Sequence, residues 1–264
     1  MSNDPLVSVI IACHNCESFL DLCIGSLVNQ TYHNLEIIIC DDASTDRSLE
    51  IIRKWEQKDQ RIIVLHNSLC QRAAQARNNC IAVSSGSFFL IQDADDYSMP
   101  NRVECLLEEF ANDPEIDFIS SAANLFSSDS STFDSVLAIK KHYPKKTNFL
   151  WGLPFIHAST MFKSECVRDI GGYRVAEETK RGQDYDMFMR LFAKGYKGKN
   201  ISKTLYCIRA DAGYINRQRN DNCHDEFLIR KNGFRLLKLM PLGYIFALKP
   251  YFVSFFHKLF RRKR

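Results

Sequence analysis

The sequence predicts an α/β fold, with an open mixed sheet flanked by helices and a helical extension at the C-terminus. Short apolar, β-branched runs alternate with segments of helical periodicity through the first half of the chain. Polar residues follow several of these runs, and no repeat or convincing linker interrupts the pattern. Alternation of this regularity is typical of right-handed βαβ units in an open sheet.

Four strands are predicted in the first half, because short apolar runs between polar segments are typical of strands buried on both faces. They span 7–12, 35–40, 62–66 and 88–92. Helices are predicted between them over about 19–27, 45–58 and 73–84, and a fourth over 100–110. Ser44 or Thr45 has the chemistry of an N-cap for the second helix.

The second half has a looser pattern. Residues 124–135 are rich in Ser and Asp and predict a loop. A strand over 159–163, a turn at Gly171-Gly172, a helix over 184–194 and a strand over 201–208 are expected after it. We therefore divide the chain into one catalytic domain, 1–235, and a C-terminal extension, 236–264.

Composition is that of an ordinary globular protein, with 45% hydrophobic and 25% charged residues among 264. The formal charge of +4 comes from the end of the chain, where residues 257–264 hold five Lys or Arg and no acid. The remainder has 30 basic and 31 acidic side chains, so no nucleic-acid partner is predicted.

The N-terminal residues and the cysteines indicate the cellular compartment of the protein. Residues 1–5 are polar and lack the features of a secretory leader, and no apolar run is long enough to cross a bilayer. Ten cysteines without an export signal indicate reduced thiols in the cytoplasm.

Polar clusters follow three of the predicted strands. Ala12-Cys13-His14-Asn15 follows the first, Asp41-Asp42 the second and Asp93-Ala94-Asp95-Asp96 the fourth. In open α/β sheets, ligands bind at the carboxyl ends of the strands. These clusters are therefore expected to converge on one crevice.

The contents of that crevice can be narrowed by elimination. No glycine precedes Gly25, so the first turn is not a dinucleotide fingerprint, and no phosphate-binding P-loop, zincin or nucleophile-elbow motif occurs. Two carboxylates separated by one residue remain. Carboxylates bind a diphosphate through Mg²⁺ or Mn²⁺, hard cations that take oxygen ligands from both. The alternative is an acidic loop that only caps the helix beginning at Pro100.

The ordered motifs resemble those of family 2 glycosyltransferases of the GT-A fold. The resemblance covers about residues 6–210. It rests on the segments 7–15, 30–38 and 41–46, and then on Ala76-Arg77-Asn78, Ser85-Gly86, Asp93-Ala94-Asp95-Asp96, Gly171-Gly172-Tyr173 and Asp184-Tyr185-Asp186.

On the donor side, the resemblance implies a nucleotide-sugar site. The backbone of Ala12 and the side chains of His14 and Glu17 would lie against the nucleoside. Asp42 would accept a hydrogen bond from the base N3–H, which favours uracil. Arg77 and Asp93 would flank the ribose and phosphates, and Asp95 would bind the metal ion.

On the acceptor side, the resemblance implies that Asp184 is the catalytic base of a single inverting displacement. An alcohol needs a positioned base to attack the anomeric carbon, and a carboxylate meets that need. The alternative is an N-cap, since 182–184 opens an apolar-periodic segment. His157 lies where relatives present polar residues to the acceptor, although a packed or surface histidine is an equal alternative.

Several positions depart from the family pattern. His14 replaces a frequent Tyr, Arg72 replaces a common Gly, and Gln183 replaces the Glu that often precedes the base. A neutral Gln183 should leave the pKa of Asp184 lower than a Glu would. No Gln-x-x-Arg-Trp follows, which predicts transfer of a single sugar rather than polymerisation.

Other functions remain open at this point. Cys13-x-x-Cys16 lies between a predicted strand and helix, as in thioredoxin-like redox proteins, and Cys40 makes a zinc site conceivable. A nucleotidyltransferase shares the α/β architecture and the metal-binding carboxylates, but its usual phosphate loop is missing. A non-catalytic sugar-nucleotide binder would not need Asp184.

The C-terminal extension is apolar and basic. Its aromatic and aliphatic residues are interrupted at Lys249-Pro250, and the basic residues follow. This pattern favours helices that lie in a membrane interface, on the cytoplasmic face, where a polyprenyl-linked or lipopolysaccharide acceptor would be found. The alternative is a pair of helices packed on the catalytic domain.

Overall fold

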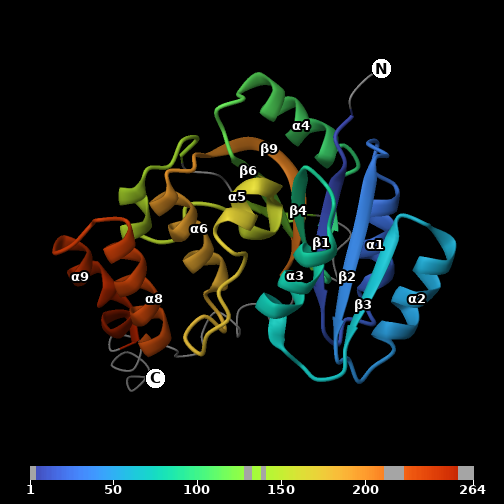
Figure 1. Ribbon diagram of the computed structural model, residues 1–264, viewed down its shortest axis with the longest axis horizontal. Coiled ribbons are helices and arrows are strands. Elements are labelled where there is room, and N and C mark those ends of the chain that lie inside the picture. The colour runs from blue at the N-terminus through green and yellow to red at the C-terminus, as the bar shows by residue number, and fades with distance from the viewer. Residues whose placement is uncertain (1–3, 128–132, 138–140, 211–222, 255–264) are drawn as a thin grey trace.

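The computed structural model describes residues 4–127, 133–137, 141–210 and 223–254 (Figure 1). Within them a mixed nine-stranded sheet has the order β3-β2-β1-β4-β8-β6-β9-β5, and β7 pairs with β6. The prediction of an open α/β sheet flanked by helices is confirmed.

The first half of the sheet is parallel. It consists of β1 (Val7–Cys13), β2 (Leu35–Asp42), β3 (Ile62–Asn67) and β4 (Phe88–Asp93). β1 pairs with both β2 and β4, and β2 pairs with β3. All four strands occur where the apolar runs predict them.

Helices cover both faces of this parallel half. α1 (Leu20–Val28), α2 (Ser48–Lys58) and α4 (Arg102–Asn112) pack on one face, and α3 (Arg72–Val83) packs on the other. The division follows the period of a strand, since Val9 and Ile11 of β1 belong to one core cluster and Ile10 to the other.

The predicted start of α2 is wrong. The helix begins at Ser48, and its N-cap, Arg47, makes no side-chain cap bond. Asp46 Oδ1 instead accepts the Ser48 N–H at 2.9 Å, while Ser44 Oγ accepts the Asn15 N–H at 3.0 Å. Ser44 therefore connects two loops at the strand ends rather than capping the helix.

The second half completes the sheet with both antiparallel and parallel pairs. Its elements are β5 (Tyr97–Ser98), β6 (Phe118–Phe126), β7 (Phe133–Leu137), η1 (Lys146–Leu150), η2 (His157–Ser159), β8 (Thr160–Lys163), α5 (Ser164–Asp169), α6 (Gln183–Lys194) and β9 (Gly198–Arg209). β8 is antiparallel to β4 and β6, whereas β9 is parallel to β6.

The loop predicted over 124–135 is wrong where the structure describes it, because β6 extends to Phe126 and β7 begins at Phe133. β6 escaped prediction because it buries polar side chains. Ser120 and Ser121 are fully buried, and both bond to Ser159 Oγ. These hydrogen bonds remove the cost of burying hydroxyl and amide groups in the sheet.

Two further helices, α8 (Cys223–Leu236) and α9 (Leu242–Ala247), follow at the C-terminus. α8 packs on α6, and its Phe234 is buried in the same core cluster as Phe188 and Met189. The expected domain boundary at 235/236 falls one residue before α8 ends. In the ranges given above, no helix combines the length and apolar character that crossing a bilayer requires.

A hydrogen-bonded cluster fixes the amino edge of the parallel strands. Glu36 Oε1 accepts from Ser8 Oγ at 2.5 Å, from Ser85 N at 2.7 Å and from Gly86 N at 3.0 Å. Burial raises the pKa of Glu36, but these bonds outweigh it and the net pKa is lowered. The cluster accounts for Glu36 and Ser85-Gly86 within the sequence motifs.

Gly86→Ala should destabilise the fold by about 1–3 kcal/mol, because overpacking forces backbone shifts. A Cβ there would lie 2.5 Å from Ser8 Oγ and 2.8 Å from both Leu6 O and Ser8 N. Gly25→Ala in α1 is the control. Its Cβ meets only Trp55 at 3.9 Å, and the loss of a helical glycine should stabilise by about 1 kcal/mol. Equal effects in urea unfolding would contradict the argument.

Candidate active site

The three polar clusters meet at the carboxyl edge of the sheet. Ala12 of β1 pairs with Cys40 of β2 on one side and with Asp93 of β4 on the other. The strand register therefore brings the ends of β2, β1 and β4 side by side, as the sequence predicts.

The turn after β1 is tied to the turn after β2. His14 is exposed, and its Nδ1 lies 2.7 Å from the backbone oxygen of Asp42. Asn15 has a left-handed φ of 53° and accepts the Thr45 N–H at 2.8 Å. Glu17 Oε2 accepts the Arg47 N–H at 2.9 Å. His14 and Glu17 thus shape this edge of the crevice, and their contact with a nucleoside stays a prediction.

Asp42 is buried, and protein groups surround its carboxylate. Oδ1 accepts from Asn67 Nδ2 and Gln71 N, each at 2.8 Å. Oδ2 accepts from Arg72 N at 2.6 Å and from Cys70 Sγ at 3.3 Å. Burial raises the pKa of Asp42, but the four hydrogen bonds lower it further than burial raises it. Asp42 therefore orders the start of α3, and a base N3–H would have to share one of these acceptor positions.

Arg72 begins α3 with a φ of 72°. This left-handed conformation suits glycine, because other residues crowd their Cβ against the backbone there. A glycine at this position would adopt this conformation without that crowding. The Arg72 side chain is exposed.

An ion pair joins α3 to the end of β4. Arg77 Nη2 lies 2.6 Å from Asp93 Oδ1, with 7% of the Arg77 side chain and 34% of the Asp93 side chain exposed. Burial lowers the pKa of Arg77, but the charge of Asp93, together with that of Asp184, raises it overall. Arg77 Nε is buried without a hydrogen-bond partner. The guanidinium is held by Asp93 at the end of β4.

The acidic loop after β4 crowds three carboxyl groups together. Asp93 and Asp95 are half-buried, whereas Asp96 is buried and accepts the Arg209 N–H at 2.8 Å. Burial and the charges of Asp93 and Asp95 raise the pKa of Asp96 well above its ordinary value. Arg209 Nε also donates to the Asp95 backbone oxygen at 2.9 Å.

The chemistry of this loop fits a divalent cation. Crowded carboxylates are relieved by positive charge, and Mg²⁺ or Mn²⁺ is usually held by one or two carboxylates together with substrate phosphates. Among the residues the structure describes, no three His, Cys, Asp or Glu side chains form a metal cage. A cation at Asp95 would therefore complete its coordination with donor oxygens.

Asp184 of α6 interacts electrostatically with Arg77 and Asp93. It is the second residue of the helix, after Gly182 as N-cap, so the prediction of Asp184 as the N-cap is wrong. Its Oδ1 accepts the Tyr185 N–H at 2.8 Å. Burial raises the pKa of Asp184, opposed by that hydrogen bond and by the charge of Arg77. A raised carboxyl pKa suits a group that must take up a proton.

His157 joins this group through Tyr173. Its Nε2 lies 2.7 Å from the Tyr173 hydroxyl, and the Arg77 guanidinium lies over the Tyr173 ring at 5.6 Å. Burial and the Arg77 charge lower the pKa of His157 to about 3, so the ring is neutral. His157 is therefore packed beside the crevice, and its role toward an acceptor stays a prediction.

Several residues that build the site are not evident from the sequence pattern. Asn78 exchanges two 2.8 Å hydrogen bonds with the backbone of Tyr173, which holds the Gly-Gly-Tyr turn against α3. Fully buried Arg102 donates to Gln92 and Ser98 side chains and to two backbone carbonyls beneath the acidic loop. In the sequence, the polar residue Gln92 at the end of an apolar strand, just before Asp93, was the one indication of the hydrogen bonds around Arg102.

The cysteines do not form one cluster. Cys13 belongs to the core cluster on one face of the sheet, whereas Cys40 belongs, with Cys80 of α3, to the cluster on the other face. Cys40 is therefore turned away from the Cys-x-x-Cys segment that a shared zinc site would need.

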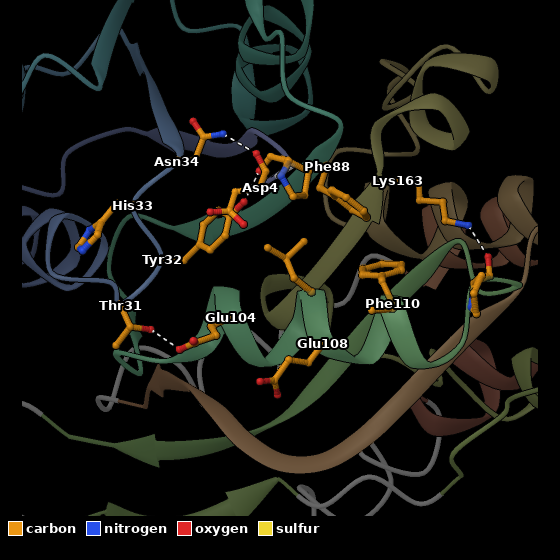
Figure 2. Close-up of a pocket in the computed structure, with 14 residues that line it drawn as sticks. Asp4, Thr31, Tyr32, His33, Asn34, Phe88, Glu104, Glu108, Phe110 and Lys163 are labelled. Carbon is orange, nitrogen blue, oxygen red and sulfur yellow. Dashed lines mark hydrogen bonds between the residues drawn. The ribbon is translucent and has the colours of Figure 1, made fainter. Parts of the chain in front are cut away.

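A surface cavity of about 920 Å³ lies elsewhere, at the amino edge of the sheet (Figure 2). Tyr32, Phe88 and Phe110 border it, with Glu104 and Glu108 along α4. None of the candidate site residues lines it. The chemistry of the crevice, and not the size of this cavity, identifies the candidate site.

Comparison with known proteins agrees with this geometry. Residues 8–170 match the model described as glycosyl transferase family 2. The chain is 30% identical over 256 residues to the putative glycosyltransferase EpsE of Bacillus subtilis (strain 168), covering 97% of this chain and 91% of that protein. It is 28% identical over 214 residues to UDP-Glc:alpha-D-GlcNAc-diphosphoundecaprenol beta-1,3-glucosyltransferase WfaP of Escherichia coli, covering 81% of each.

Solved structures share the fold. TarS of S. aureus in complex with UDP superposes with a TM-score of 0.65 at 18% identity, covering 88% of this chain and 69% of that chain. The mannosyltransferase PcManGT from Pyrobaculum calidifontis, in complex with GDP-Man and Mn²⁺, gives 0.66 at 17% identity, covering 96% and 76%.

Arg72→Gly should raise the free energy of unfolding by up to about 1 kcal/mol, because it removes a Cβ from a left-handed residue. Arg72→Ala is the matched control, since it keeps the Cβ and loses only the exposed side chain. Chemical unfolding of both variants measures the difference. A glycine variant less stable than the alanine variant would refute the strain argument.

Proposed function

The chain belongs to glycosyl transferase family 2, and we propose that it moves one sugar from a nucleotide-sugar donor to an acceptor hydroxyl with inversion. The alternatives of a nucleotidyltransferase and of a redox or zinc protein are set aside, because the family match covers the crevice motifs from β1 to the acidic loop. The observation that carries the proposal is the meeting of Arg77, Asp93 and Asp184 at one carboxyl edge.

The donor side is supported by the arrangement of charge. Asp95 would hold Mn²⁺ or Mg²⁺, which when bound supplies positive charge to the leaving diphosphate. Arg77, fixed by Asp93, has a buried Nε–H with no partner in the protein. The positive charge of Arg77, partly offset by Asp93, would attract a phosphate of the donor. The backbone of Ala12 lies between the ends of β2 and β4, where a nucleoside would rest.

The acceptor side is supported by the position and pKa of Asp184. The carboxylate would take the proton of an acceptor hydroxyl as that oxygen bonds to the anomeric carbon. The bond from this carbon to the diphosphate oxygen breaks in the same displacement, so the configuration inverts. Because burial raises the pKa of Asp184, the carboxylate is a stronger base than an exposed aspartate.

We propose uridine as the nucleoside. WfaP is named for a UDP-Glc donor and TarS was solved with UDP, whereas PcManGT was solved with GDP-Man. Experiment must therefore distinguish a uridine-containing donor from a guanosine-containing donor. Asp42, next to the crevice, is the predicted partner of the base.

We propose a glycan or lipid-linked acceptor at the cytoplasmic face of the membrane. The name of WfaP specifies a diphosphoundecaprenol-linked acceptor. A lipid-linked sugar is the usual kind of acceptor in assembly of cell-surface polysaccharide or lipopolysaccharide.

Asp184→Asn should lower kcat by about 10²–10⁴-fold, because the amide cannot accept the acceptor proton. Donor binding should be unchanged, since the side chain keeps its shape. In the unchanged protein the rate should fall as the pH drops through the pKa of Asp184. This fall in rate should occur at higher pH than an exposed aspartate would give, because the pKa of Asp184 is raised in the folded protein.

Initial rates with a radiolabelled donor, together with a donor-binding measurement on the same preparation, test this role. Full turnover of the Asn variant would refute the base assignment. Loss of both turnover and donor binding would refute a role confined to the acceptor side.

Thermal stabilisation by nucleotides tests the donor class. UDP with Mn²⁺, at a hundred times the Kd of UDP, should raise the free energy of unfolding by about 2.7 kcal/mol. GDP with Mn²⁺ at the same concentration should raise it less. Omission of the metal or Asp95→Asn should abolish most of this shift. Stabilisation that is the same for UDP and GDP would contradict the uridine proposal, and stabilisation without metal would contradict the role of Asp95.

A further inference from the structure

The C-terminal helices expose a set of large apolar side chains, here called the apolar face. It consists of Leu242, Tyr244, Ile245, Tyr251, Phe252 and Val253, which are 39–64% exposed. Trp151, 68% exposed, lies next to it with its ring 5.0 Å from that of Phe246. Apolar groups gathered in this way mark an interaction surface, because a soluble fold ordinarily scatters them.

These side chains are not a poorly packed part of the core. α9 packs on the protein through other residues, since Gly243 and Ala247 are buried. A Cβ on Gly243 would lie 2.9 Å from Phe234 Cβ of α8, so the two helices are in close contact. Lys249 Nζ also donates to the Trp151 backbone oxygen at 2.8 Å. The apolar face is therefore the outer side of helices already seated on the domain.

The charge around the face is mainly positive. The first turn of α8, next to Tyr251, carries Asp225 and Glu226, and Glu226 pairs with Arg230. From residue 231 to the end, the sequence contains nine Lys or Arg and no Asp or Glu. Four of these cations, at 231, 235, 238 and 249, belong to the described helices and their connections, and the basic residues 258–264 lie outside the described residues. Apolar side chains with a net excess of cations around them are complementary to a bilayer with anionic headgroups. A protein partner would have to supply a matching acidic rim.

The face is connected to the acceptor side of the crevice. α8 packs on α6, the helix that begins next to Asp184. Ile229 of α8 lies 2.5 Å from where a Gly182 Cβ would be, and the Arg230 guanidinium lies over the Tyr185 ring at 5.1 Å. In Figure 1, α8 and α9 lie beside α6 at the end of the molecule opposite α1 and α2.

We propose that the apolar face is a membrane-docking surface for anionic bilayers, and that docking presents the Asp184 side of the crevice to an acceptor in the same leaflet. The docking itself stands on the exposed side chains and the charge pattern. The presentation of the acceptor rests on the proposed function.

Flotation of the full-length chain with lipid vesicles tests the surface. The chain should float with vesicles of phosphatidylcholine and phosphatidylglycerol, and less with phosphatidylcholine alone or at high salt, because screening weakens the attraction. Ile245→Glu combined with Phe252→Glu should lower the vesicle-bound fraction by about ten-fold or more, since two apolar groups no longer enter the interface. Leu22→Glu on α1, an exposed apolar site at the opposite end of the molecule, should leave binding unchanged.

The measurement of nucleotide stabilisation on the same variants separates this proposal from the proposed function. Unchanged stabilisation by UDP and Mn²⁺ with lost flotation would support the docking surface. Equal flotation of all variants, or none of the unchanged chain, would overturn it. A chain that is dimeric without lipid, that becomes monomeric with the two Glu substitutions and that never floats would overturn it in favour of a second copy on this face. Loss of nucleotide stabilisation in the unchanged chain would defeat the proposed function and leave the flotation result standing.

Discussion

Arg77 of α3 and Asp93 of β4 form an ion pair of 2.6 Å at the centre of the crevice, and the groups on either side depend on it. Asp93, Asp95, Asp96 and Asp184 would otherwise concentrate negative charge around one edge of the sheet. The Arg77 guanidinium offsets part of that charge, lies over Tyr173 and helps keep His157 neutral. The Asp93 side chain is 34% exposed, so loss of one partner should cost less than the about 3–5 kcal/mol typical of a fully buried pair. The pair joins α3 to the end of β4.

A second arginine supports the acidic loop from beneath. Arg102 is fully buried, and hydrogen bonds to two carbonyls, an amide and a hydroxyl satisfy its two terminal amino groups. Burial lowers its pKa to about 10, so it remains a cation at neutral pH. Its charge lies near Asp93 and Asp96 without an ion pair to either. Arg102 thus supports the loop from beneath, while Asp93 pairs with Arg77 and Asp96 is buried against the backbone of Arg209.

The donor half of the site could be predicted because it is local in the sequence. Each polar cluster follows its own apolar strand, and the parallel register brings Ala12 between Cys40 and Asp93. The partners of Arg102, Asp42 and Asn78 could not be predicted, because they come from distant segments and leave no periodic signal. β6 could not be predicted for a related reason. Its serines are typical of loops in the sequence, and only the hydrogen bonds to Ser159, a distant residue, allow them to be buried in a strand. The left-handed φ of Arg72 could not be predicted, because only glycine adopts that conformation often enough for the residue type to indicate it.

The acceptor half of the site is assembled from segments that are distant in the sequence, unlike the donor half. Asp184, His157 and Tyr173 come from separate segments of the second half of the chain and meet only through packing. α6, which carries Asp184, is buried between the sheet and α8, so its position depends on C-terminal residues such as Ile229 and Phe234. A change in the outer side chains of α8 or α9 leaves the donor strands untouched. The chain can therefore alter the surroundings of its acceptor through the C-terminal helices while it keeps the strand ends that bind a nucleotide.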